Sequence, residues 1–142
     1  MMFTEMPMSP ATLTILDRST VNLRGQPEQT FILVCPQSEI SVRELIRLRV
    51  WQEVEAYNQQ QGETFSGLVQ PTDAERTLNG YKMRRPRLID VQAQYELALR
   101  AFEQNGFIVL VGEKQATSLD ETFDVADTDE VTFLKLMQLV GG

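Results

Sequence analysis

Apolar and polar residues alternate in two segments near the start of the chain. In residues 11–18, leucine and isoleucine fall on one side and threonines on the other, which is the period of a half-buried strand. Residues 29–35 (QTFILVC) are aromatic, β-branched and largely apolar, as is typical of a strand. Gly25 and Pro27 indicate a turn between the two segments. So short a connection predicts an antiparallel hairpin.

The pattern then changes to helical spacing. Ser41 and Glu44 form a capping-box pattern, which predicts a helix that runs to about Gln59. Its predicted buried stripe consists of Val42, Leu45, Ile46, Val50, Val54 and Tyr57. Leu48 and Trp51 lie off that stripe, and two interpretations stay open for them. They either pack under the following segment or form an exposed contact for a partner.

Residues 63–89 are the least periodic part of the chain. A second capping pattern at residues 72–75 predicts a short helix that ends near Gly80. Asp90 is placed to cap a clearer helix over residues 91–104, which Asn105 and Gly106 would end. We therefore expect a helical insertion at about residues 60–105.

Three further segments of extended character follow the second helix. Residues 107–111 (FIVLV) predict a strand, residues 118–125 mix a turn with a few extended residues, and residues 131–138 predict the last strand. The order of elements predicts an α+β fold in which a mixed sheet packs on one long helix. The last strand is apolar on both faces, so we expect it beside the first strand, parallel to it, at the centre of the sheet.

These elements predict one domain over residues 11–138. Residues 1–10, rich in Met and Pro, are expected to be loosely ordered. Residues 139–142 are expected to form a flexible tail that ends on two glycines.

Composition excludes several classes of function. The net charge of −7 argues against binding to nucleic acid or to an anionic membrane. The chain has no histidine and a single cysteine, Cys35, so the usual general base is absent and we expect no metal site. We expect Cys35 to act as a small hydrophobic residue of the second strand. The start of the chain does not resemble a signal peptide, and we expect a cytoplasmic protein.

One basic cluster interrupts the acidic chain, at residues 82–87 (KMRRPR). It is either a solvated loop that balances nearby carboxylates or a contact for an acidic partner.

The C-terminal third resembles a known family. The segments GFIVLVGEKQ, SLDETFDV and DEVTFLKLMQLVGG, over residues 106–142, resemble the closing strands and diglycine tail of β-grasp ubiquitin-like proteins and sulfur carriers. Residues 11–58 match that family in element order. With its inserted helices, the chain looks most like the ubiquitin-like proteins of bacterial conjugation operons.

The resemblance implies that chemistry is done on this protein by a partner, and that it is not itself an enzyme. An activating enzyme of the family uses ATP and magnesium to adenylate the carboxylate of the last glycine, so no cofactor is expected to be bound here. Gly142 would be the reactive terminus and Gly141 would keep the tail thin, with Leu139 and Val140 as tail contacts. Along the last strand we expect Leu134 and Leu136 to face inward. The docking face would then hold Phe133 and Met137. Alternatively, the insertion buries both faces of this strand.

Three functions follow as hypotheses. The first is a protein modifier joined through Gly142 to target amines, with an activating enzyme, a conjugating enzyme and a deconjugating protease as partners beside the target proteins. The second is a sulfur carrier with a thiocarboxylate at Gly142. The third is a non-covalent binding module. The larger size favours the modifier over the sulfur carrier.

Overall fold

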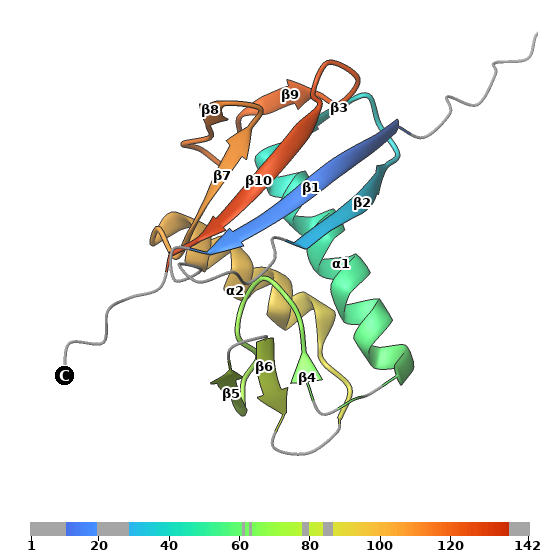
Figure 1. The fold of residues 1–142 in the computed structure, drawn as a ribbon, viewed down its shortest axis with the longest axis vertical. Helices are drawn as coiled ribbons and strands as arrows, with labels where there is room; N and C mark the ends of the chain where they lie inside the picture. Colours follow the sequence, from blue (N-terminus) through green and yellow to red (C-terminus); the bar gives the residue numbers. More distant parts are fainter. Residues whose placement is uncertain are drawn as a thin grey trace, which may run out of the picture.

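The main sheet of the protein has five strands in the order β2-β1-β10-β7-β8 (Figure 1). The structure is a computed structural model, and it describes residues 11–19, 29–60, 62, 64–77, 80–83 and 87–136. The strands of this sheet are β1 (Ala11–Ser19), β2 (Gln29–Cys35), β7 (Phe107–Val111), β8 (Lys114–Gln115) and β10 (Glu130–Lys135). The α+β class predicted from the sequence is confirmed.

The first and last strands lie parallel at the centre of this sheet, as predicted. β1 pairs with β10 from Thr14 opposite Glu130 to Ser19 opposite Lys135. β2 joins β1 in the expected antiparallel hairpin, and β7 pairs antiparallel with β10. The last strand is shorter than predicted because it ends at Lys135.

Helix α1 (Val42–Gln60) covers one face of the sheet (Figure 1). The Ser41 hydroxyl oxygen accepts a hydrogen bond from the Glu44 amide at 3.0 Å, which confirms the predicted cap. All six residues of the predicted stripe are buried. Trp51 packs edge-on against Tyr95 of α2 (Val91–Glu103), with ring centroids 5.7 Å apart, so the off-stripe position contacts a later segment of the chain.

The insertion is not purely helical, and the short helix predicted at residues 72–80 is wrong. The structure has a three-stranded sheet of order β4-β6-β5, made of β4 (Thr64–Phe65), β5 (Ala74–Thr77) and β6 (Gly80–Met83). Asp73 has a φ of 61°, which a helix does not allow. Gly80 has a φ of 150°, and a Cβ there would lie 2.6 Å from the Phe65 carbonyl oxygen, so a glycine is needed for β6 to approach β4.

The other predicted helix is confirmed as α2. The Asp90 carboxylate accepts hydrogen bonds from the backbone N–H groups of Gln92 and Ala93, and Asn105 ends the helix with a φ of 60°. The extended residues expected at 118–125 form β9 (Thr122–Asp124), which pairs with β3 (Glu39–Ser41) in a separate small sheet.

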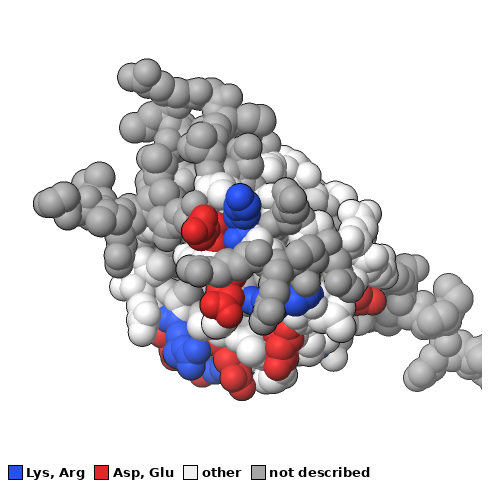
Figure 2. Space-filling view, turned by 90° about the horizontal axis from the view of Figure 1, so that it is seen from below, with Lys and Arg blue, Asp and Glu red and all other residues white. Residues whose placement is uncertain are grey.

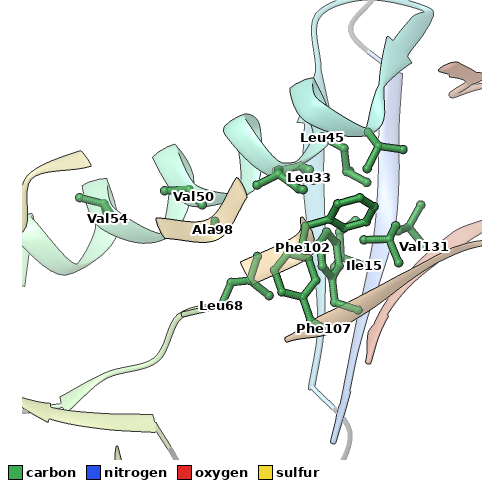
Figure 3. Packing of buried hydrophobic residues seen from close by; sticks show 14 of the residues in the cluster. Ile15, Leu33, Leu45, Val50, Val54, Leu68, Ala98, Phe102, Phe107 and Val131 are labelled. Carbon is green, nitrogen blue, oxygen red and sulfur yellow. The ribbon is translucent and has the colours of Figure 1, made fainter. Parts of the chain in front are cut away.

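The hydrophobic core lies between the main sheet and the two helices (Figure 3). Ile15 and Val131 come from the central strands, and Leu45 and Val50 come from α1. Phe102 of α2 lies against Phe107 of β7, with ring centroids 5.9 Å apart (Figure 3). Cys35 is fully buried in this core, which agrees with the hydrophobic role predicted for it.

Candidate functional site

The candidate site is the C-terminal end of β10, where the chain leaves the centre of the main sheet. β1 flanks β10 on one side and β7 on the other. After the last strand residue, the Leu136 amide donates to the Gly106 carbonyl oxygen at 3.1 Å. The predicted tail residues Leu139, Val140, Gly141 and Gly142 lie outside the described residues, as does Met137, which was predicted for the docking face.

The prediction that Phe133 belongs to an outward docking face is wrong. Its side chain is fully buried, and its ring lies 5.9 Å from that of Phe107. Leu134 and Leu136, predicted to face inward, are half-buried. The register of β10 against β1 explains why Phe133 is buried. It sets Val131 beside Ile15, so Val131 and Phe133 both point toward α1. Because side chains alternate, Leu134 takes the opposite face of the sheet.

A buried charge network, which we define as Asp17, Arg49, Glu53 and Lys135, lies under this end of the sheet. The Arg49 guanidinium donates to both carboxylate oxygens of Asp17, at 2.5 and 2.6 Å, and to Glu53 at 3.1 Å. Arg49 is 1% exposed, although arginine is rarely found so fully buried. Its two carboxylate partners supply the charge-assisted hydrogen bonds that such a position requires.

Two aromatic rings complete the environment of Arg49. Its guanidinium carbon lies 4.5 Å from the centroid of Phe133 and 5.1 Å from that of Phe31. The faces of aromatic rings attract cations, so Phe133 contributes to this site from within the core and not from the surface.

The network also binds the insertion to the end of β10. The Lys135 ammonium donates to the Gly67 carbonyl oxygen at 3.0 Å. On the same segment, the Leu68 amide donates to the Glu53 carboxylate at 3.2 Å. Four segments that are far apart in the sequence, namely β1, α1, the insertion and β10, therefore meet here.

Burial sets the protonation behaviour of this network. It raises the pKa of Glu53, with a further contribution from the negative charge of Asp17, against the opposing effect of Arg49 and Lys135. Burial likewise lowers the pKa of Lys135, and the Arg49 charge adds to this shift. For Arg49, burial alone would lower the pKa, but the Glu53 and Asp17 carboxylates outweigh it and raise the pKa.

The described residues include one thiol, that of Cys35. Burial raises the pKa of the Cys35 thiol, with a smaller contribution from Glu44, so the nucleophilic thiolate is disfavoured. Among the residues that the structure describes, no group of three or more cysteine, aspartate and glutamate side chains could hold a metal ion. The network instead fixes the segment from which the predicted tail begins.

A second feature is a hollow of about 360 Å³ that lies beside β7. Arg43 on its rim pairs with Asp120 at 3.3 Å, and both side chains are exposed. Glu121, near the same rim, accepts hydrogen bonds from Thr117 and Ser118, which lower its pKa. These charged side chains at the rim therefore have ion-pair or hydrogen-bond partners within the chain.

The predicted basic cluster lies partly outside the described residues, at positions 84–86. The Arg87 guanidinium donates to the Thr72 carbonyl oxygen, and Lys82 pairs across strands with Glu75. On the end of the molecule shown in Figure 2, described acidic and basic side chains are interspersed and form no region of one sign. The Arg87 guanidinium therefore has a partner within the chain, and Lys82 lies opposite Glu75 in the register of β6 against β5.

Sequence reasoning missed the buried charge network, although the sequence holds a signal for it. Arg49 follows Leu45 by four residues and precedes Glu53 by four, so both charged residues fall on or beside the buried stripe. Asp17 continues the inward alternation of Leu13 and Ile15. Opposite charges at buried positions of two neighbouring elements indicate an internal ion pair.

Comparisons with known proteins give no family. The sequence matches no protein-family model and no curated protein. Among solved structures, the chain is similar to a superantigen-like protein from Staphylococcus aureus, determined in complex with sialyl-Lewis X, with a TM-score of 0.39 and 10% sequence identity. The match covers 92% of this chain and 54% of that chain, so this chain spans about half the length of that protein. A likeness at this level identifies neither a family nor a function.

In the part of the chain that the structure describes, no helix has the length and apolar character needed to cross a lipid bilayer.

Proposed function

We propose that the protein is a β-grasp, ubiquitin-like modifier that a partner enzyme activates at Gly142 and transfers to target amines. The observation that supports this most is the position of β10. The last described strand lies at the centre of the main sheet, parallel to β1 and antiparallel to β7, while α1 covers one face. This is the arrangement expected of the β-grasp fold that the C-terminal segments resemble.

The hydrogen bonds at the end of β10 fix the base of the proposed tail. Lys135 and Leu136 are held by hydrogen bonds to Gly67 and Gly106, so the strand is fixed up to the point where the sequence Met-Gln-Leu-Val-Gly-Gly begins. A fixed base with a thin diglycine end suits entry into the narrow active site of an activating enzyme. In the proposal, Leu139 and Val140 contact that enzyme and Phe133 does not.

The chemistry belongs to the partner. A free α-carboxylate is ionised at neutral pH and is a poor acyl donor. Attack of a Gly142 carboxylate oxygen on the α-phosphorus of magnesium-bound ATP forms an acyl adenylate and releases pyrophosphate. A cysteine thiolate of a partner displaces AMP to give a thioester, and a target amine displaces the thiolate to give an amide. Each step transfers the acyl group of Gly142, and the described residues of this chain fix the strand from which the tail begins.

Intact mass spectrometry tests this proposal. The protein is incubated with ATP, magnesium and an activating enzyme of the ubiquitin-like family, and a variant that lacks Gly142 is treated in parallel. A thioester or amide adduct of the full chain, absent from the deletion variant, is the expected result. Replacement of one oxygen by sulfur at Gly142 would show the sulfur carrier instead. No ATP-dependent change of mass would leave a non-covalent binding module.

A further inference from the structure

The outer edge of β2 has the properties of a strand that pairs with another chain. β2 is the last strand on one side of the main sheet, and within that sheet it pairs with β1 alone (Figure 1). It is seven residues long and contains no charged residue and no proline. Folded proteins usually protect such edges with charges, prolines or very short strands. The opposite edge, β8, is protected in this way, since it has two residues and one of them is Lys114.

The side chains on the outer face of β2 are apolar. Leu33 and Cys35 point into the core, so Ile32 and Val34 point away from α1. Ile32 is 53% exposed and Val34 is 51% exposed. Among the described residues, one other large hydrophobic residue is similarly exposed, Leu88 at 63%. Among the described strands, none pairs with this outer edge of β2, and an exposed apolar pair on such an edge indicates an interaction surface.

One side chain of α1 forms a hydrogen bond to the outer edge of β2, where the backbone of a neighbouring strand would otherwise bond. The Ile32 carbonyl oxygen accepts a hydrogen bond of 3.3 Å from the side-chain amide of Gln52, which comes from α1. Gln52 is exposed, so it can rotate away when a backbone N–H replaces it. The same Gln52 lines a hollow on α1 together with Leu48 and Trp51, so one side chain contacts both the strand edge and this hollow.

Charge and sequence indicate which partner fits this edge. The protein carries a net charge of −7, so two copies can approach closely only along an uncharged surface. An antiparallel pair of β2 strands centred on Ile32 sets Ile32 opposite Ile32 of the second copy and Thr30 opposite Val34. Every such pair is uncharged, and most of the residues are β-branched or aromatic, which suits cross-strand contacts.

We propose that β2 pairs antiparallel with β2 of a second copy of this chain about a two-fold axis, which joins the two main sheets into one. A two-fold contact of this kind uses the same surface on both copies, as the self-complementary strand requires. It leaves the end of β10 free, because β1 separates β2 from β10. The inference is independent of the proposed chemistry at Gly142.

Light scattering coupled to size exclusion tests the pairing over a dilution series. We expect the wild type to have the mass of two chains at high concentration and of one chain after dilution. Ile32→Lys sets two lysines opposite each other across the two-fold axis, and Val34→Lys sets a lysine opposite Thr30 of the second copy, so both are expected to remove the dimer. The matched control Leu88→Lys changes an equally exposed hydrophobic residue away from β2 and is expected to keep it. Circular dichroism verifies that each variant is folded.

A cross-link tests the register. The Cα atoms of directly opposed residues in an antiparallel pair lie about 4.5–5.5 Å apart, which is within the range of a disulfide. Ile32→Cys is therefore expected to form a covalent dimer under mild oxidation, and Leu88→Cys is not. The wild type is expected to stay uncross-linked because Cys35 is fully buried. A wild type that stays monomeric at every concentration, a dimer that persists in both lysine variants, or equal cross-linking at positions 32 and 88 would overturn the proposal.

Discussion

The ammonium group of Lys135 donates a hydrogen bond to the carbonyl oxygen of Gly67, across 68 positions of sequence. This contact joins the last strand of the main sheet, β10, to the insertion that precedes α2. Together with the bond from Leu68 to Glu53, it makes the insertion a brace for the end of β10. The insertion thereby acquires a structural role at the base of the proposed reactive tail.

Removal of the Lys135 ammonium is expected to loosen the insertion. In Lys135→Met, amides of residues 64–70 should exchange with deuterium about tenfold faster, because a hydrogen bond to a charged group contributes about 1.5–3 kcal/mol. Lys114→Met is the matched control, since Lys114 is exposed on β8. Unchanged exchange at residues 64–70, or equal acceleration throughout the protein, would contradict the brace.

Arg49 is expected to be the most sensitive charged residue of the chain. Arg49→Leu removes the guanidinium and leaves Asp17 and Glu53 buried without it, which is expected to lower the free energy of unfolding by about 3–5 kcal/mol. Urea denaturation monitored by circular dichroism measures the loss.

Arg43 provides the control for that measurement, because its pair with Asp120 is exposed. Arg43→Leu is expected to change the free energy of unfolding by about 1 kcal/mol or less. Similar losses in the two variants would show that the Arg49 network contributes no more than a surface ion pair.

The pKa of Glu53 predicts a pH dependence with a definite sign. Burial raises the pKa of Glu53 in the folded state. Between a pH of about 4 and this raised pKa, the folded protein therefore keeps a proton that the unfolded chain has released. The stability of the wild type relative to Glu53→Gln should therefore fall as the pH rises through that range. Urea titrations of both proteins at several pH values measure the difference. A difference that increases with pH would mean that Arg49 depresses the pKa of Glu53 more than burial raises it.

The face assignment of β10 predicts unequal effects at neighbouring positions. Phe133→Ala is expected to cost about 3–5 kcal/mol of stability, because a fully buried aromatic ring leaves a cavity. Leu134→Ala is expected to cost less, because Leu134 is half-buried on the other face. Thermal unfolding of the two variants measures the difference, and a larger loss at Leu134 would restore the orientation inferred from the sequence.

Local patterns in the sequence were sufficient to predict most of the elements. The period of Leu13 and Ile15, the stripe of α1 and the caps at Ser41 and Asp90 depend on residues close together in the chain, and each is confirmed. The apolar character of residues 131–136 was enough to predict a central strand.

What the sequence did not predict depends on contacts between distant segments. The face taken by Phe133 is set by the register of β10 against β1, and a shift of one residue reverses it. The capping pattern at residues 72–75 predicts a helix start, but the φ of 61° at Asp73 is not helical and Gly80 is the first residue of β6. The bond from Lys135 to Gly67 has no local signal at all.

Detection of covalent conjugates between this protein and other proteins is the most direct test of its proposed function. Trypsin cleaves after Lys135, so a conjugate would leave residues 136–142, Leu-Met-Gln-Leu-Val-Gly-Gly, joined through Gly142 to a target lysine. The tagged protein is purified from its own cells under denaturing conditions, digested with trypsin and analysed by tandem mass spectrometry. The proposal predicts target peptides that carry this remnant and disappear when Gly142 is deleted. Recovery of the C-terminal peptide solely in its free form, under conditions in which the protein is expressed, would contradict it.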